Sequence, residues 1–341
     1  MKKIALITGI SGQDGAFLAD FLIKKKYIVV GTDRRSSRDD KWRLENLGII
    51  DKIIIEDLDI NETSQIYRIL NKYKFDEIYN LAAQSFVASS FLNPLTTANT
   101  TAIACLKILE TIRNLHKKPK FYQASSSEMY GGMNISNKKQ NEDTPFNPRS
   151  PYAISKLFAH YVTKNYRESY KLFAVSGICF NHESHLRGEE FVTRKITSCL
   201  AKIQNKKLKY FELGNIYAKR DWGYAGDYVV GMWKSLQMAK ADDYVFATGE
   251  TYTIKQFIDE ARKFLSFETY WIGKNLNMQL IRKNDKSTII KINKNYFRPT
   301  EVNVLVGDNT KAKKILGWKP KCNFKNLVKK MMQQDLKRFS R

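Results

Sequence analysis

Seven residues, Gly-Ile-Ser-Gly-Gln-Asp-Gly at positions 9–15, restrict the fold of this chain more than any other segment. They follow the apolar run KIALIT and precede DGAFLADFLIKKK, in which Phe17, Leu18, Phe21 and Leu22 recur at the spacing of one helix face. Glycines between a strand and a helix permit a tight turn, close approach of a pyrophosphate to backbone N–H groups, and close packing of helix on sheet. In this context the motif predicts a dinucleotide-binding turn rather than a plain one.

Strand-like and helix-like segments alternate along the first half of the chain. Apolar runs at YIVVGT, KIIIE, DEIYNLA, KFYQAS and LFAVSGI are separated by helical stretches that include 63–73, 95–114 and 151–169. This alternation predicts an α/β fold with a Rossmann-type, doubly wound parallel sheet and helices on both faces. After about residue 180 it loosens, so we expect a Rossmann domain over 1–180, to which segments near 215–250 return, and a smaller substrate-binding lobe over 181–341.

The charge balance is strongly basic, with 58 lysines and arginines against 34 acidic residues and a net charge of +24. The lysines are nevertheless spread along the whole chain, and no basic helix or aromatic-interleaved patch appears. This pattern favours a solvated lysine-rich surface, with some arginines serving a nucleotide diphosphate, over nucleic-acid binding.

Compartment is predicted from hydropathy and cysteine usage. No apolar run approaches the roughly 18 residues of a membrane span, and the N-terminus leads directly into a strand, so we expect no cleaved leader and no membrane partner. Cys105, Cys179, Cys199 and Cys322 are scattered and lack metal-like histidine spacing. A reduced cytoplasmic protein without a metal site is expected.

The segment after the second expected strand, DRRSS, carries two signals for the choice of cofactor. Arg34 and Arg35 are suited to gripping a ribose 2′-phosphate, which favours NADP. Asp33, about 20 residues beyond the glycines, is suited to a free 2′-hydroxyl, which favours NAD. We weight the arginine pair more heavily.

An acid-base set is predicted from two further motifs. FYQASSSEMYG ends a strand with three serines and Glu128, and SPYAISK places Tyr152 and Lys156 four apart on one helix face. A lysine ammonium beside a phenol favours the phenolate, which makes tyrosine a usable proton acceptor. A second Y-x-x-x-K at Tyr270 and Lys274 contains a glycine and follows no strand of the expected nucleotide-binding sheet, so context separates the two. Alone, the serine stretch is equally compatible with a strand end and a capping residue.

These motifs, in this order, resemble the extended short-chain dehydrogenase/reductases. NLAAQSFV, TPFNPRSPYAISK, FNHESHLRGEEFVTRKI, AKRDWGYAGDYV, YFRPTEV and LGWKP narrow the resemblance to the GDP-mannose 4,6-dehydratase family over roughly residues 3–335. The resemblance implies an NADP-dependent hydro-lyase that makes a 4-keto-6-deoxy GDP-sugar by internal hydride transfer and loss of water. By matching position, Tyr152 takes the 4-hydroxyl proton, Lys156 lowers the tyrosine pKa and holds the nicotinamide ribose, Ser126 hydrogen-bonds the 4-oxygen, and Glu128 removes the C5 proton.

The same resemblance implies the binding residues. Cofactor contacts besides Tyr152 and Lys156 are Gly9, Ile10, Ser11, Gly12, Gln13, Asp14, Gly15, Arg34, Arg35, Ser36, Ser37, Asp59, Ile60, Leu81, Ala82, Ala83, Gln84, Ser85, His182 and Arg187. Contacts to the GDP-sugar besides the catalytic residues are Ser85, Asn181, Lys195, Arg220, Arg298 and Glu301. His185 receives no role.

Several positions depart from the usual family pattern. Ser126 replaces threonine, which leaves room beside the reacting carbons and makes GDP-manno-heptose a candidate substrate beside GDP-mannose. HLRG at 185–188 replaces Pro-Arg-Arg-Gly, and Asp33 replaces a basic or neutral residue. The segment after DRRSS is also shorter, so a homodimer is expected more firmly than the homotetramer that the resemblance implies.

Two other functions stay open. A nucleotide-sugar epimerase or reductase of the same fold requires Tyr152 and Lys156 but not Glu128 as a C5 base. A non-catalytic NADP-binding regulator commonly loses the Tyr-Lys pair, which this chain retains.

Overall fold

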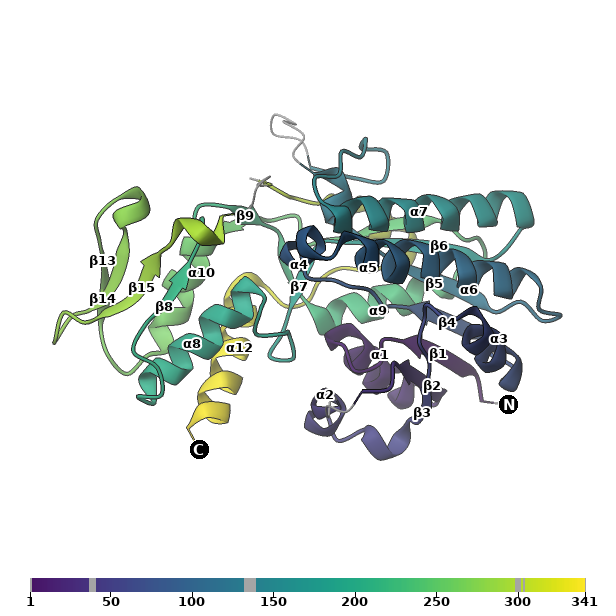
Figure 1. The fold of residues 1–341 in the computed structure, drawn as a ribbon, viewed down its shortest axis with the longest axis horizontal. Coiled ribbons are helices and arrows are strands. Elements are labelled where there is room, and N and C mark those ends of the chain that lie inside the picture. Colours follow the sequence, from purple (N-terminus) through teal and green to yellow (C-terminus); the bar gives the residue numbers. More distant parts are fainter. Residues whose placement is uncertain (1, 37–40, 132–138, 298–301, 303, 341) are drawn as a thin grey trace.

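A seven-stranded parallel sheet forms the centre of the protein, seen in a computed structural model that describes residues 2–36, 41–131, 139–297, 302 and 304–340. The strand order is β3-β2-β1-β4-β5-β6-β11, and every neighbouring pair is parallel (Figure 1). The strands are β1 Ile4–Thr8, β2 Ile28–Asp33, β3 Ile54–Asp57, β4 Glu77–Asn80, β5 Lys120–Ser126, β6 Ala174–Cys179 and β11 Asp243–Phe246. The predicted doubly wound fold is confirmed.

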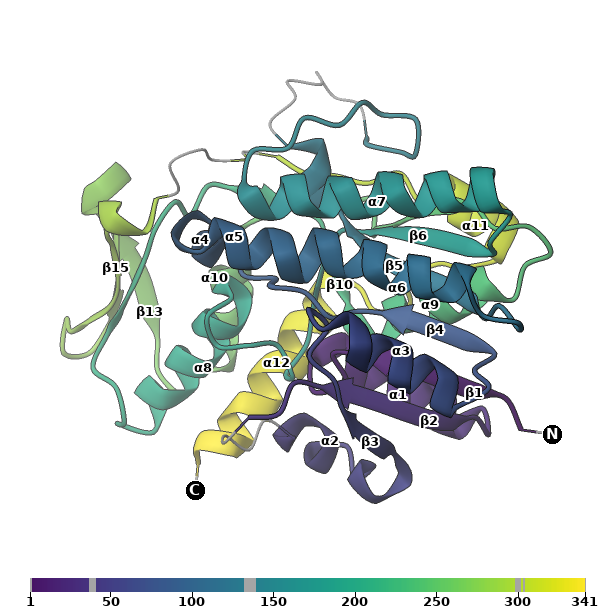
Figure 2. The same ribbon diagram turned by 45° about the vertical axis from the view of Figure 1, so that its right-hand side comes forward.

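Helices cover both faces of this sheet (Figure 2). One face packs against α1 (Gln13–Lys24), α2 (Trp42–Asn46), α9 (Ala225–Leu236) and α11 (Thr310–Leu316). The other packs against α3 (Thr63–Lys72), α6 (Ala104–Arg113) and α7 (Pro151–Tyr170). Among the described residues, no helix combines the length and the apolar character needed to cross a bilayer.

Two helices on the second face show how the local sequence sets helix boundaries. Helix α7 begins where the Ser150 hydroxyl accepts the Ala153 N–H at 3.1 Å, with Pro151 in the first turn, and it ends at Lys171 with φ of 56°. The single helix expected over 95–114 is instead α5 (Pro94–Ala98), a π-helical turn (Asn99–Ile103) and α6. The wider turn falls at a polar, β-branched run that adjoins the main cleft.

A second lobe is built around its own apolar core. Its four-stranded sheet has the order β13-β14-β15-β8, and α8, α10 and α12 pack against it. The elements are α8 Val192–Gln204, β8 Phe211–Leu213, α10 Ile254–Ala261, β13 Thr269–Ile272, β14 Gln279–Arg282, β15 Thr288–Ile292 and α12 Phe324–Phe339. Short pairs connect this lobe to the sheet: β7 (Asn181–Glu183) with β10 (Trp222–Tyr224), and β9 (Lys219–Arg220) with β12 (Tyr252–Thr253). Strand β11 belongs to the central sheet and α9 packs on it, so part of the chain after residue 180 lies with the first lobe. The division of the chain into domains at residue 180 stays a prediction.

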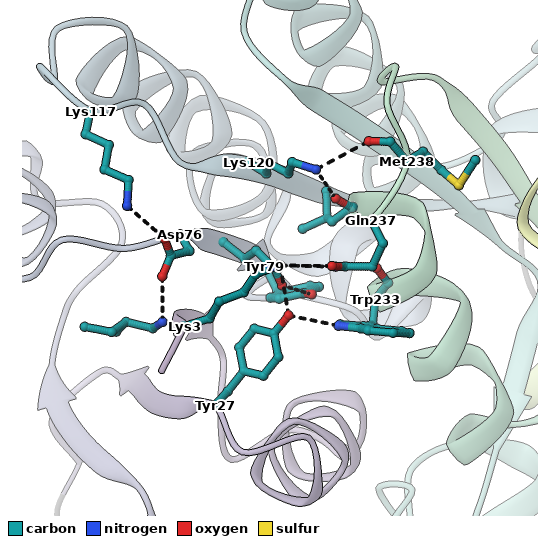
Figure 3. Close-up of polar contacts among 12 residues, drawn as sticks. Lys3, Tyr27, Asp76, Tyr79, Lys117, Lys120, Trp233, Gln237 and Met238 are labelled. Atoms are coloured by element: carbon teal, nitrogen blue, oxygen red, sulfur yellow. Dashed lines mark hydrogen bonds and ion pairs between the residues drawn. The ribbon is translucent and has the colours of Figure 1, made fainter. Parts of the chain in front are cut away.

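A buried carboxylate ties the sheet to α9 at the amino ends of the strands. Glu77 is 1% exposed, and it accepts hydrogen bonds from Tyr79 at 2.7 Å, Tyr27 at 3.0 Å and Gln237 at 3.1 Å. Lys3 completes the set at 3.1 Å. Figure 3 shows Tyr27 meeting Trp233 beside this cluster. The network lies at the amino ends of the strands, away from the strand ends that form the cleft, so we expect it to stabilise the packing of α9 on the sheet.

Glu77→Ala is therefore expected to lower the free energy of unfolding by about 1–3 kcal/mol, because it leaves the buried Tyr79 hydroxyl without its hydrogen-bond partner. Denaturant unfolding measures the change. Asp51→Ala, at an exposed acidic position, is the control and should change stability by less than about 0.5 kcal/mol. Equal losses in both variants would contradict this role.

Candidate functional site

A cleft of about 1030 Å³ opens at the carboxyl ends of the parallel strands. It spans the point between β1 and β4 where the strand order reverses, which is where open α/β sheets bind ligands. Its walls come from the glycine turn, the ends of β4 and β5, the start of α7, the segment after β6, and the second lobe. The cleft therefore has the position and size of a nucleotide site.

The glycine turn forms the floor of one end of the cleft. Gly9 has φ of +70°, and a Cβ there would lie 3.0 Å from the Ala82 backbone. A Cβ on Gly15 would lie 2.4 Å from the Gly9 carbonyl oxygen, so glycine is needed where α1 packs on the turn. Gly12 caps α1 and lines the cleft, which leaves the N-terminal N–H groups of α1 facing it. This geometry suits a pyrophosphate.

The predicted acid-base residues lie together at the end of β5 and the start of α7. Ser126, Glu128, Tyr152 and Lys156 all line the cleft and are all buried, with exposed fractions between 4% and 9%. The Ser126 hydroxyl accepts the Glu128 N–H at 3.2 Å, and Ser126 also acts to lower the pKa of the Tyr152 phenol. Ser126 thus caps the 3₁₀ turn Ser127–Tyr130, while its chemical role stays a prediction.

Burial controls the protonation of the tyrosine and lysine. It raises the pKa of Tyr152 to about 12, against the opposing effect of the Ser126 hydrogen bond. It also lowers the pKa of Lys156 to about 8, where the ammonium donates to the Ala124 carbonyl at 2.7 Å and lies 5.9 Å from the Tyr152 ring centroid. In the chain alone the phenol is protonated at neutral pH, so the lowering of its pKa by Lys156 stays a prediction.

Hydrogen bonds hold the segment after β6 against the start of α1. His182 Nε2 contacts the Asp14 carboxylate at 2.7 Å, and Nδ1 contacts the Phe180 carbonyl at 2.7 Å. Because both partners are acceptors, both ring nitrogens must donate a proton. Burial opposes ionisation of the ring, but Asp14 raises the pKa of His182. His182 in turn holds the pKa of Asp14 below its usual value. The imidazolium and carboxylate form a fixed ion pair beside the glycine turn.

The predicted 2′-phosphate contacts lie at the outer end of the cleft. Arg34 lines it, whereas Arg35 and Ser36 are exposed beyond its lining, and Ser37 falls outside the described residues. One oxygen of Asp33 accepts the Ser11 N–H at 3.0 Å, which draws this carboxylate toward the glycine turn. Ile10 is fully buried against Gly31 and contributes no side chain to the cleft.

The remaining predicted cofactor contacts all line the cleft. They are Ser11, Gln13, Asp14, Asp59, Ile60, Leu81, Ala82, Ala83, Gln84, Ser85, His182 and Arg187.

Of the six predicted sugar-nucleotide contacts, four lie in the described part of the chain, and one of these, Ser85, lines the cleft as already stated. Asn181, Lys195 and Arg220 line the cleft, with the Lys195 ammonium 4.2 Å from the Tyr296 ring centroid. Arg220 is buried and donates to the Val302 carbonyl at 2.6 Å. Arg298 and Glu301 lie outside the described residues.

Sequence reasoning missed several residues of this wall. They include Glu183, Glu190, Asn215, Ile254, Asn295 and Tyr296. A Cβ on Gly188 would lie 2.2 Å from Glu190 Oε1, so the glycine in HLRG lets this carboxylate fold back toward the cleft. The other residues come from separated elements of the second lobe, and no local motif brings them together.

Unsatisfied polar atoms mark where a ligand fits this cleft. Among the residues that the structure describes, Asn61 Oδ1, Gln84 Oε1 and Asn181 Oδ1 are buried without a hydrogen-bond partner, and all three residues line the cleft. Buried polar atoms normally have partners, so these atoms are positioned for ligand groups. Together with the glycine turn, they fit a dinucleotide at one end and a second polar ligand at the other.

The fold and site define a nucleotide-sugar-modifying enzyme of the extended short-chain dehydrogenase/reductase class. Residues 6–331 match the family model described as GDP-mannose 4,6 dehydratase. The chain therefore belongs to the GDP-mannose 4,6-dehydratase family, a family of hydro-lyases, as the sequence motifs predicted.

Relatives agree with this assignment along nearly the whole chain. The GDP-mannose 4,6 dehydratase of Drosophila melanogaster is 47% identical over 98% of this chain and 86% of its own length. The human GDP-mannose 4,6 dehydratase is 44% identical, covering 98% of this chain and 92% of its own. The Vibrio cholerae O1 enzyme is 45% identical, with 98% and 94% covered.

Solved structures share the fold at lower identity. UDP-glucose 4-epimerase from Thermotoga maritima, with UDP-glucose, superposes with a TM-score of 0.81 at 23% identity, covering 98% of both chains. The dTDP-glucose 4,6-dehydratase of Bacillus anthracis, with NAD, gives 0.78 at 18% identity, covering 97% of this chain and 96% of that one. These likenesses confirm the fold, and their ligands belong to those proteins.

Proposed function

We propose that this chain is a GDP-sugar 4,6-dehydratase that converts GDP-mannose or GDP-D-glycero-D-manno-heptose to the 4-keto-6-deoxy GDP-sugar. The observation that carries the proposal is that Ser126, Glu128, Tyr152 and Lys156 lie buried together in one cleft, where the Ser126 hydroxyl accepts the backbone N–H of Glu128. An oxidation at C4 and an elimination across C5 and C6 need two acid-base groups within one sugar's reach.

Each residue has a role that follows from its position. Tyr152 receives the proton of the sugar 4-hydroxyl, and Ser126 holds that oxygen by a hydrogen bond. Glu128 removes the C5 proton and delivers it to the departing C6 hydroxyl, which leaves as water. When C6 receives hydride, C5 regains a proton from Tyr152, which holds the proton taken from the 4-hydroxyl. The Lys156 ammonium, fixed by the Ala124 carbonyl, stabilises negative charge on the phenol oxygen. A nicotinamide dinucleotide held at the glycine turn would supply a reversible two-electron oxidation, so that hydride lost from C4 could be returned to C6.

We propose NADP as that dinucleotide, held by the residues predicted from the sequence. Arg34 lines the outer end of the cleft, and an Asp33 oxygen is already committed to Ser11. Cationic side chains at this end favour the additional phosphate of NADP.

Arg34→Ala/Arg35→Ala is accordingly expected to raise the Kd of NADP by at least about tenfold more than that of NAD, because charge-assisted contacts are lost only with the phosphorylated cofactor. Fluorescence titration with each reduced cofactor measures both values. Lys313→Ala/Lys314→Ala on α11 removes the same charge from an exposed site and is the control. Equal weakening of both cofactors would contradict 2′-phosphate recognition.

The choice of sugar is proposed to depend on Ser126. Its side chain lines the cleft and lacks the methyl group of the threonine expected in this family, so the site has room for the extra hydroxymethyl of a manno-heptose.

Ser126→Thr should lower the heptose-to-mannose ratio of kcat/KM by about tenfold. The added methyl group fills the proposed space, and one such group changes the discrimination between two substrates by about 1–3 kcal/mol. Steady-state kinetics with both GDP-sugars in parent and variant measure the ratio. An unchanged ratio would show that the space does not select the sugar.

A homodimer through α4, α5 and α7 is proposed as the assembly. Leu92 at the end of α4 (Val87–Leu92) and Leu95 on α5 are 82% and 80% exposed. Ile154, Phe158 and Tyr161 form an exposed stripe on α7 at helical spacing. A continuous apolar surface of this kind is typical of a contact between subunits. The homotetramer stays a prediction. It was related to the segment after DRRSS, and residues 37–40 of that segment lie outside the described residues.

The predicted cytoplasmic location also stays a proposal, which the four free cysteines support.

Incubation with a panel of GDP- and UDP-sugars, followed by mass spectrometry, tests the activity. A product lighter than its GDP-sugar substrate by one water supports the dehydratase. A product of unchanged mass would indicate the epimerase alternative, whose fold is the same. Binding of NADP without any product would indicate the non-catalytic regulator.

A further inference from the structure

A second cavity, of about 480 Å³, lies between α2, the loop that carries His185, and the C-terminal helix α12. It is separate from the main cleft, since none of its lining residues belongs to the cleft lining. Helices α2 and α12 approach each other here, with the Arg338 guanidinium 4.4 Å from the centroid of the Trp42 ring (Figure 2). The proposed dehydration uses no residue of this cavity.

The charges around the cavity do not cancel. Arg194 and Asp335 are each 1% exposed and bind one another through contacts of 2.6 and 2.8 Å, so they form a neutral pair in the wall. Lys337 and Arg338 also line the cavity, and neither has an ion-pair partner within the described part of the chain. Two positive charges therefore remain available to a ligand.

His185 adds a further polar group to the same wall. It packs edge-on against Phe17 at 6.0 Å, and no hydrogen bond to its ring is present among the described residues. Burial lowers the pKa of His185 to about 4, and the cations Arg194 and Arg338 act in the same direction. The ring is thus neutral at pH 7 and can donate a hydrogen bond to an anion.

We propose that this cavity is a binding site for a small phosphate-bearing anion, with Lys337 and Arg338 providing its charge and His185 a hydrogen bond. A planar guanidinium fork and a lysine point charge match the several oxygens of a phosphate or diphosphate group. The Trp42 ring holds Arg338 in place, and the Arg43 guanidinium also lies 4.4 Å from its centroid. The volume is within the range of small-ligand pockets.

Calorimetric titration of inorganic pyrophosphate tests this site in the full chain, with NADPH and GDP present at saturation so that the main cleft is filled. The parent should bind one additional pyrophosphate per chain. Lys337→Ala/Arg338→Ala should weaken that binding by about tenfold or more. Lys325→Ala/Lys329→Ala removes two exposed charges from the same helix outside the cavity and should change the affinity by less than about twofold.

The His185 ring signals provide a local readout by NMR, assigned with His185→Asn. They should shift on addition of pyrophosphate in the parent and in the Lys325/Lys329 control, but not in the Lys337/Arg338 variant. Orthophosphate and ADP, titrated in the same way, distinguish a free inorganic anion from a nucleotide as the source of the phosphate. Absence of the additional binding event, equal weakening in both charge variants, or unmoved His185 signals during binding would each overturn the proposal.

Discussion

Tyr152→Phe is expected to reduce the formation of 4-keto product by about 10²–10⁴-fold, because it removes the group that accepts the 4-hydroxyl proton. Tyr152 lines the cleft and is 8% exposed, so its hydroxyl lies where the sugar is proposed to bind. The first oxidation itself should fail, and cofactor reduction in a single turnover, followed by absorbance, measures that step directly. Binding of NADPH should be largely retained.

Tyr270→Phe is the matched control for this experiment. Tyr270 begins the only other Y-x-x-x-K in the sequence, but it lies on β13 in the second lobe, and its hydroxyl contacts Lys286. Its loss should leave the rate close to that of the parent. Comparable rates in the Tyr152→Phe variant and the parent would exclude Tyr152 as the proton acceptor.

Glu128→Gln has the second large expected effect and a different signature. If Glu128 removes the C5 proton, oxidation at C4 still proceeds while elimination slows by about 10²-fold or more, so reduced cofactor accumulates in the first turnover. The amide keeps the size of the side chain, and the backbone N–H that Ser126 accepts is untouched. Stopped-flow absorbance for the reduced cofactor, with quenched product analysis, separates the two steps.

The contrast between these variants tests whether Tyr152 acts in the oxidation and Glu128 in the elimination. Tyr152→Phe should show no reduced cofactor, whereas Glu128→Gln should show more of it than the parent. Product formation by Glu128→Gln at the parent rate would remove this carboxylate from the mechanism and favour an epimerase or reductase.

Local patterns explain why much of the fold was predictable. The apolar runs KIALIT, YIVVGT and KFYQAS correspond to β1, β2 and β5, since a strand buried on both faces needs a continuous apolar sequence. Glu128 and the Tyr152–Lys156 pair were predicted to belong to one site, and the structure brings them to one cleft because parallel strands all end at the same edge.

Long-range contacts explain what the sequence did not reveal. The pairing of His182 with Asp14 joins residues 168 positions apart, and no spacing rule links them. Arg43 likewise donates to the carbonyls of Leu186 at 2.6 Å and Ser11 at 3.0 Å, and it was not singled out because a single arginine in a short helix has no distinctive pattern. The rise that burial causes in the pKa of Tyr152 was likewise not foreseen, since no sequence pattern reports how deeply the start of a helix is buried.

Conversion of GDP-mannose labelled with deuterium at C4 tests the central claim most directly. The chain is expected to move that hydrogen within one active site, because the oxidation and the elimination are assigned to residues that share a single cleft. Mass spectrometry and NMR of the product should find the deuterium at C6 of a 4-keto-6-deoxy sugar, with no net consumption of cofactor. A product with the mass of the substrate, or a 6-deoxy product without deuterium at C6, would contradict internal hydride transfer by this enzyme.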